Sequence, residues 1–127
     1  MLWRIGIDNP SVNSKTKKEN NLILGLSDVA VATSGDYRNY FEVNDIIYSH
    51  IIDPTTGYPV KNVIASATVV APNCAEADAW ATALLVMGVK GLDILEELNG
   101  FEGLIFSRVN NGFQRLMTSG FEKSIIQ

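Results

Sequence analysis

The residues best suited to chemistry gather around the only histidine of the sequence, His50. It lies in the stretch Ser49–Pro59, together with the carboxylate of Asp53 and two threonine hydroxyls. The loops that follow strands often carry functional groups, and a tight turn here would gather these side chains at one strand end. The same residues also form plain turns, in which the aspartate bonds its own backbone and the histidine is an ordinary surface or core residue. His50 could pair with Asp53 or Asp36, but no Ser-His-Asp triad follows from the sequence.

A second candidate site lies further along the chain, where Asp78 and Thr82 are four residues apart. Residues with this spacing lie on one face of a helix. A carboxylate and a hydroxyl are hard oxygen ligands, which suit magnesium or calcium better than zinc. Two ligands make no complete cage, but magnesium commonly keeps waters and takes oxygens from substrate phosphates. The alternative is an aspartate favoured by the helix dipole and a threonine that bonds a backbone carbonyl.

Two neighbouring strands are predicted to bring the polar turns to one place. Residues 48–52 are β-branched and aromatic, and the Asp-Pro pair that follows ends the strand because proline has no backbone N–H. Residues 38–43 and 46–52 flank an Asn-Asp pair, which is a hairpin signal. This hairpin would place residues 34–37 and 50–57 at the same end of two strands. The two turns are therefore expected to line one site.

The remaining elements predict an α+β fold with a mainly antiparallel sheet and two helices. Residues 74–87 form a helix that is capped by Asn73 and Glu76 and buries small and apolar side chains, and residues 90–98 form a second helix with Leu92, Leu95 and Leu98 inward. Between residues 22 and 33 the pattern fits two strands or one bulged strand. Further strands are expected over residues 2–7 and 65–71, with a last hairpin over residues 104–109 and 113–118.

The composition restricts the class of protein. The chain has 127 residues, of which 46% are hydrophobic, so we expect one globular domain over residues 1–127. A net charge of −4 argues against a nucleic-acid binder, and a single cysteine excludes an internal disulfide. No apolar run is long enough for a membrane span. Strand-like residues follow Met1 directly, so we expect no signal peptide and a chain that begins inside a longer protein.

Three ordered motifs resemble the FAD:protein FMN transferase family of the ApbE type, formerly described as thiamine-biosynthesis lipoproteins. The motifs are Ala-Thr-Ser-Gly-Asp-Tyr-Arg-Asn-Tyr at residues 32–40, Ser-His-Ile-Ile-Asp-Pro-Thr-Thr-Gly at 49–57, and Glu-Ala-Asp-Ala-Trp-Ala-Thr-Ala at 76–83. Their order and spacing both agree with the family, and Trp-Arg-Ile-Gly-Ile at residues 3–7 fits the segment before the first motif. The resemblance covers essentially the whole chain.

The resemblance implies a magnesium-dependent enzyme that splits the pyrophosphate of FAD, moves FMN onto a threonine of an acceptor flavoprotein subunit and releases AMP. It assigns the metal site to Asp78 and Thr82, with the backbone around Ala81. His50 is expected to orient the diphosphate or to take the threonine proton. The implied flavin-site residues are Ser34, Gly35, Asp36, Tyr37, His50, Ile52, Asp53, Thr56 and Gly57.

The resemblance also implies that the chain is the C-terminal half of a two-repeat, T-fold-like enzyme whose parent is a periplasmic or cell-envelope lipoprotein. Two alternatives stay open: hydrolysis of FAD to FMN and AMP without an acceptor, and a non-catalytic half that binds flavin or assembles. The isolated chain is expected to be inactive and to form a homodimer, because a missing repeat would leave strand residues uncovered. The strand residues expected at that surface are Ile5, Ile7, Ile23 and Leu24.

Overall fold

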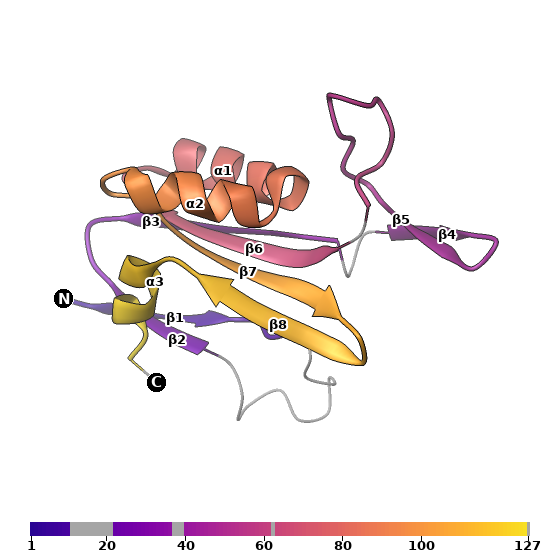
Figure 1. Cartoon of the computed structure of the whole chain (residues 1–127). Helices are drawn as coiled ribbons and strands as arrows, with labels where there is room; N and C mark the ends of the chain where they lie inside the picture. Colours follow the sequence, from indigo (N-terminus) through magenta and orange to yellow (C-terminus); the bar gives the residue numbers. More distant parts are fainter. Residues whose placement is uncertain (11–21, 37–39, 62, 127) are drawn as a thin grey trace.

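The computed structural model describes residues 1–10, 22–36, 40–61 and 63–126. Its elements form three layers, with two helices on one face of a four-stranded sheet and a two-stranded sheet with a short helix on the other face (Figure 1). A separate hairpin extends beyond the end of the main sheet. The α+β fold and the mainly antiparallel pairing are as predicted.

The main sheet has the strand order β3 (Ala30–Gly35), β6 (Ile64–Ala71), β7 (Glu102–Val109) and β8 (Gly112–Met117), with every neighbouring pair antiparallel. All eight residues of β6 are buried, because this strand lies inside the sheet and is covered on both faces. β7 and β8 form the predicted C-terminal hairpin. β3 is an edge strand. Because it pairs antiparallel with β6, its last residues lie beside the start of β6.

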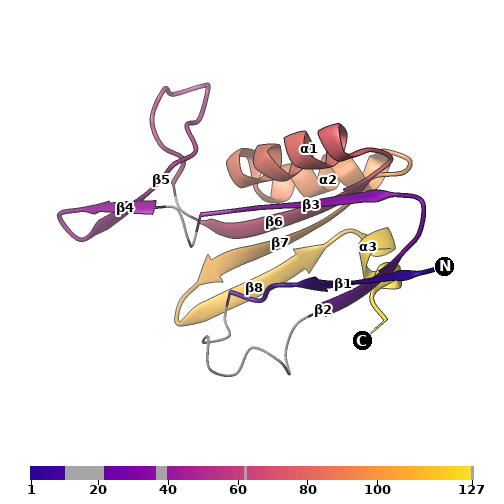
Figure 2. The same cartoon turned by 180° about the vertical axis from the view of Figure 1, so that it is seen from behind.

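Helices α1 (Cys74–Met87) and α2 (Val89–Glu97) cover one face of this sheet (Figures 1 and 2). Asn73 caps α1 as predicted, because its side-chain oxygen accepts from the Glu76 N–H at 2.9 Å. Helix α1 packs against β3 and β6 through its predicted inward residues. Leu98, expected to be inward, is instead 38% exposed, because α2 ends at Glu97. The buried side chains of α1 are Ala77, Ala81, Leu84 and Leu85.

The opposite face of the sheet is covered by β1 (Trp3–Ile7), β2 (Leu22–Leu26) and α3 (Ser119–Ser124). α3 is a third helix that the sequence analysis did not predict, and its Phe121 is fully buried. Ile7 and Leu24 are buried against Phe121 and the apolar face of the main sheet. The expectation that these two residues lie on an uncovered surface is therefore wrong, since the chain covers them itself.

The hairpin of β4 (Tyr40–Val43) and β5 (Ile46–Ser49) is paired as predicted and extends away from the layers (Figure 1). Asn44 and Asp45 have φ values of 51° and 64°, which is the left-handed pair that a tight hairpin turn requires. The largest exposed apolar side chains of the hairpin are Tyr40, Phe41, Val43, Ile46 and Ile47. Self-association stays a prediction. The exposed apolar side chains of this hairpin could contact a second copy of the chain.

Candidate functional site

The first and third motifs meet where the end of β3 passes beside α1. Ser34 Oγ and Thr82 Oγ1 lie 3.1 Å apart and share a hydrogen bond in which either hydroxyl can be the donor. Ser34 and Thr82 are both half-buried, so this contact is shielded from part of the solvent. The structure thus brings together two predicted site residues that are far apart in the sequence. Tyr37, the last flavin-site residue predicted within the first motif, lies outside the described residues.

The predicted metal ligands lie on one uninterrupted helix, α1. Asp78 is exposed and Thr82 is half-buried, and they occupy one face of the helix. Ala81 is fully buried, and because its side chain is a methyl group, only its backbone carbonyl oxygen could bind a metal ion. Within the described part of the chain, no three histidine, cysteine, aspartate or glutamate side chains are grouped around a possible metal site.

The donor set nevertheless fits magnesium. One carboxylate, Asp78, and the hydroxyl pair of Thr82 and Ser34 are all hard oxygen donors. Magnesium accepts such a small protein contribution, because waters and substrate phosphates commonly complete its six ligands. A site of this composition would bind the metal weakly before a phosphate arrives.

Asp36, which follows β3, is held by an arginine that the sequence analysis did not name. The Asp36 side chain is 2% exposed, and its two carboxylate oxygens accept from Arg108 Nη2 at 2.7 Å and Nη1 at 3.2 Å. Its backbone N–H donates to the Ala65 carbonyl at 3.0 Å. A carboxylate beside a turn in an apolar surrounding needs a cation when it is buried, and this rule was the available signal for Arg108.

The loop after β5 is folded back on itself. Asp53 Oδ1 accepts from the Thr55 N–H at 2.8 Å and from Thr55 Oγ1 at 2.7 Å, which confirms the interpretation of Asp53 as a turn residue. These two hydrogen bonds hold the pKa of Asp53 below its usual value, the side-chain bond having the larger effect. The Asp53 carbonyl accepts from the Gly57 N–H at 2.8 Å, and Gly57 has a φ of 74°. His50 and Ile52 are exposed.

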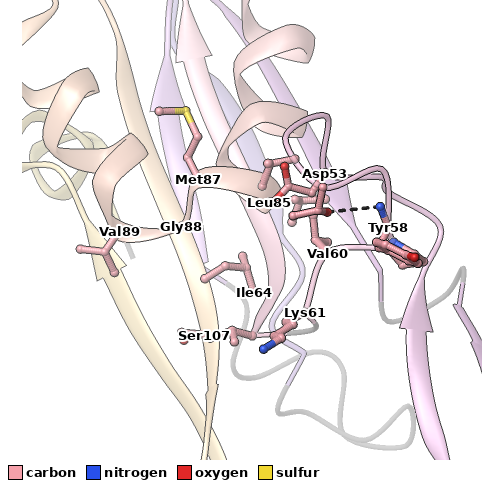
Figure 3. Close-up of a pocket in the computed structure, with 14 residues that line it drawn as sticks. Asp53, Tyr58, Val60, Lys61, Ile64, Leu85, Met87, Gly88, Val89 and Ser107 are labelled. Atoms are coloured by element: carbon pink, nitrogen blue, oxygen red, sulfur yellow. Dashed lines mark hydrogen bonds between the residues drawn. The ribbon is translucent and has the colours of Figure 1, made fainter.

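A cavity of about 610 Å³ lies between this loop and the junction of α1 and α2 (Figure 3). Asp53 and Thr56 line it from the loop, while Leu85 and Gly88 line it from the end of α1. Its volume is within the range of small-molecule sites, and its walls are mainly apolar with a few polar groups. The other lining residues are Tyr58, Pro59, Val60, Lys61, Val63, Ile64, Val86, Met87, Val89 and Ser107.

The first and second motifs both lie toward the C-terminal end of α1, but no residue of the first or third motif is among those that line the cavity, so the two polar turns do not share it. The first motif contacts α1 through Ser34, and the second motif shares a cavity with the end of the same helix. His50 is placed at the base of the loop but does not line the cavity. Among the described residues, no helix is long and apolar enough to span a membrane.

Comparison with known proteins gives consistent matches. The model of the ApbE family matches residues 1–105. An FAD:protein FMN transferase from Vibrio cholerae is 44% identical over 120 residues, which are 94% of this chain and 35% of the relative. The enzyme of that description from Haemophilus influenzae is 39% identical over 122 residues, which are 95% of this chain and 34% of the relative.

Solved structures agree with these matches. The flavin transferase ApbE from Vibrio cholerae superposes with a TM-score of 0.77 at 39% identity, covering 96% of this chain and 37% of that one. The ApbE protein from Thermotoga maritima gives a TM-score of 0.80 at 32% identity, covering 99% and 39%. The chain spans about a third of the length of the curated relatives that it matches. From its motifs, its fold and these matches, the chain belongs to the ApbE family.

Proposed function

We propose that this chain is the C-terminal part of a magnesium-dependent FAD:protein FMN transferase and carries part of its active site. The observation that supports this most directly is the contact between Ser34 and Thr82, because it joins the first motif to the helix that carries the metal-ligand candidates. The relatives named above are FAD:protein FMN transferases, and their matches to this chain cover 94% and 95% of its residues. The substrate is therefore proposed to be FAD, and the acceptor a threonine of a flavoprotein subunit.

The chemistry required is the exchange of one phosphoanhydride bond for one phosphoester bond. The hydroxyl oxygen of the acceptor threonine attacks the phosphorus of the FMN part, the bond to the AMP phosphate breaks, and AMP leaves as the second product. The threonine proton must pass to a base. Such a transfer depends on positioning and charge neutralisation more than on covalent catalysis by the enzyme.

The residues of this chain divide the work by their placement. Asp78 and Thr82, with the backbone of Ala81, would hold a magnesium ion, which would neutralise charge on the phosphate oxygens, and Ser34 would support the site through its contact with Thr82. His50 lies at the base of the exposed loop, where an imidazole could accept the threonine proton or orient the diphosphate. Thr56 and the apolar wall of the cavity would contact the flavin part.

The experiment uses this chain in place of the matching region of the Vibrio cholerae transferase, because the chain alone spans only a third of that enzyme. Asp78→Asn should abolish magnesium-dependent release of AMP from FAD and leave the thermal unfolding temperature unchanged, since Asp78 is exposed. Asp93→Asn, which removes an exposed carboxylate from α2, is the matched control and should keep full activity.

The products separate the remaining functions. FMN covalently attached to the acceptor supports the transferase, whereas free FMN and AMP without an attached product would show an FAD hydrolase. An Asp78→Asn enzyme with unchanged, metal-dependent turnover would refute the metal assignment. A chimaera that binds FAD and magnesium but releases no AMP would favour the non-catalytic half.

A further inference from the structure

An ion pair crosses the main sheet at the end where the motifs gather. Arg108 lies near the end of β7 and Asp36 follows β3, and these two strands flank β6 on opposite sides. The Arg108 side chain therefore reaches across β6 to the carboxylate, with its two nitrogens on the two oxygens. A forked contact of this kind fixes orientation as well as distance, because the guanidinium and the carboxylate are both planar.

The strand between them is irregular at the same place. The register of β6 against β7 shifts between Ile64 and Ser66, which leaves Ala65 as the extra residue. The Ala65 carbonyl accepts from the Asp36 N–H at 3.0 Å, and the Arg108 N–H donates to the Val63 carbonyl at 2.7 Å. The backbone of Asp36 is thus held by the β-bulge at Ala65, and its side chain is held by Arg108.

This double attachment holds the residue that directly follows the end of β3. Gly35 and Ser34 are the two residues before Asp36, and the Ser34 hydroxyl meets Thr82 at 3.1 Å. Ser34 and Gly35 are paired with Ala67 and Ser66 of β6, so the ion pair adds a charged side-chain attachment where this ladder ends.

We propose that Arg108 is a positioning residue for the active site: it holds Asp36 and thereby keeps Ser34 against Thr82 beside the Asp78 face of α1. Both oxygens of Asp36 are bonded to Arg108, so the role proposed for this aspartate is to hold the geometry of the site. Arg108 lies beyond residue 105, where the match to the family model ends. The proposal rests on the proposed function only for the identity of the ligand, FAD with magnesium.

The test uses the chain of 127 residues itself with four single variants and one double variant. Arg108→Met removes the cation, Arg108→Lys keeps the charge but loses the fork, and Asp36→Asn changes the other partner. Arg115→Met is the matched control, because Arg115 is an exposed arginine on the adjacent strand β8. The control changes the net charge by the same amount without touching Asp36.

Two readouts are measured on each variant. The first is the NMR signal of the Thr82 methyl group with the Ser34 and Gly35 amides, which reports the contact without any ligand. The second is the affinity for FAD in the presence of magnesium, measured by flavin fluorescence. Arg108→Met should shift the three signals and weaken FAD binding at least tenfold, and Asp36→Asn should do the same. Arg108→Lys should fall between Arg108→Met and the original chain, and Arg115→Met should match the original chain.

The double variant of Arg108→Met and Asp36→Asn should lose no more than either single variant, because both remove one contact. If Arg108→Met does not fold, Arg108→Lys decides by the same two readouts. Unchanged Ser34, Gly35 and Thr82 signals in a folded Arg108 variant, or equal effects of the Arg108 and Arg115 changes, would overturn the proposal. If the chain alone binds no FAD, the affinity is measured in the chimaera described above, which alone decides the proposed function, while the NMR comparison on the chain decides the role of Arg108.

Discussion

At the end of the main sheet, side chains that are far apart in the sequence contact one another, whereas the loop after β5 is held by bonds among its own neighbours. Ser34 with Thr82 and Asp36 with Arg108 join β3 to α1 and to β7. Asp53 instead bonds Thr55, two residues away. Both arrangements carry residues of the family motifs, but only the first depends on the packed core.

This difference indicates what each region contributes. The region around Ser34 and Thr82 is ordered by burial, so its geometry and the stability of the whole chain depend on the same contacts. The loop with His50 is exposed, and changes there should affect the chemistry with little effect on folding. Substitutions in the core should therefore change stability, and substitutions in the loop should change the chemistry.

The core beneath the first region should be the most sensitive part. Leu84→Ala removes a fully buried side chain of α1 from the hydrophobic core between the helices and the main sheet. It should lower the free energy of unfolding by about 2 to 5 kcal/mol. Ile47→Ala on β5, where the side chain is 45% exposed, should change it by less than about 0.5 kcal/mol. Urea unfolding followed by circular dichroism measures both. Similar losses in the two variants would show that the hairpin is part of the same cooperative core.

The exposed loop should show the opposite behaviour. His50→Ala, placed in the chimaera described above, should lower FMN transfer by about a hundredfold or more, which is typical for loss of a group that moves a proton. The unfolding temperature should stay within a few degrees of the original, because the side chain is exposed. Glu42→Ala on the same hairpin is the control and should transfer FMN normally. A large fall in unfolding temperature with near-normal transfer would make His50 a structural residue.

The smallest effect concerns the pKa of Asp53. The folded loop lowers this pKa, so the associated stability is present above the usual value of the carboxyl group, 3.8, and is lost as the pH falls through the folded value. Thr55→Val removes the hydroxyl donor and should raise the pKa of Asp53 towards 3.8, measured by NMR titration of the carboxyl carbon.

Thr55→Ser keeps the hydroxyl and is the conservative control. Glu96, whose pKa is lowered mainly by the Ser119 hydroxyl, should titrate unchanged in both variants. If Thr55→Val also moves Glu96, the loop is coupled to the packed region and the separation fails.

The sequence was most informative where a local rule decides the structure. The Asn-Asp turn of the β4–β5 hairpin, the Asn73 cap and the buried face of α1 each depend on residues close together in the chain, and all were predicted. α3 was missed because Ser119–Ser124 is short and contains Gly120, which weakens any helical pattern. This helix forms because Phe121 is buried and Glu96 accepts from the Ser119 N–H.

The same distinction between local and long-range information applies to the candidate site. Ser34, Asp53, Thr56, Asp78 and Thr82 were named from their motifs, but their mutual placement depends on how the sheet pairs. Arg108 was missed because the rule that a buried carboxylate needs a cation does not say which cation, and Arg108 is 72 positions from Asp36. The burial of Ile7 and Leu24 was likewise outside a local interpretation, since it depends on α3 and the far face of the sheet.

The ion pair between Asp36 and Arg108 has a consequence for the order in which the chain can become structured. Its partners are 72 positions apart, whereas the Asp53–Tyr58 bond closes a segment of five. Closing the longer segment costs about 2 kcal/mol more in chain entropy, at about 0.6 kcal/mol for each doubling of length. During synthesis, the His50 loop and α1 are complete before the arginine is made. Asp36 can therefore pair with Arg108 only after β7 has left the ribosome. All three motifs have been synthesised by then.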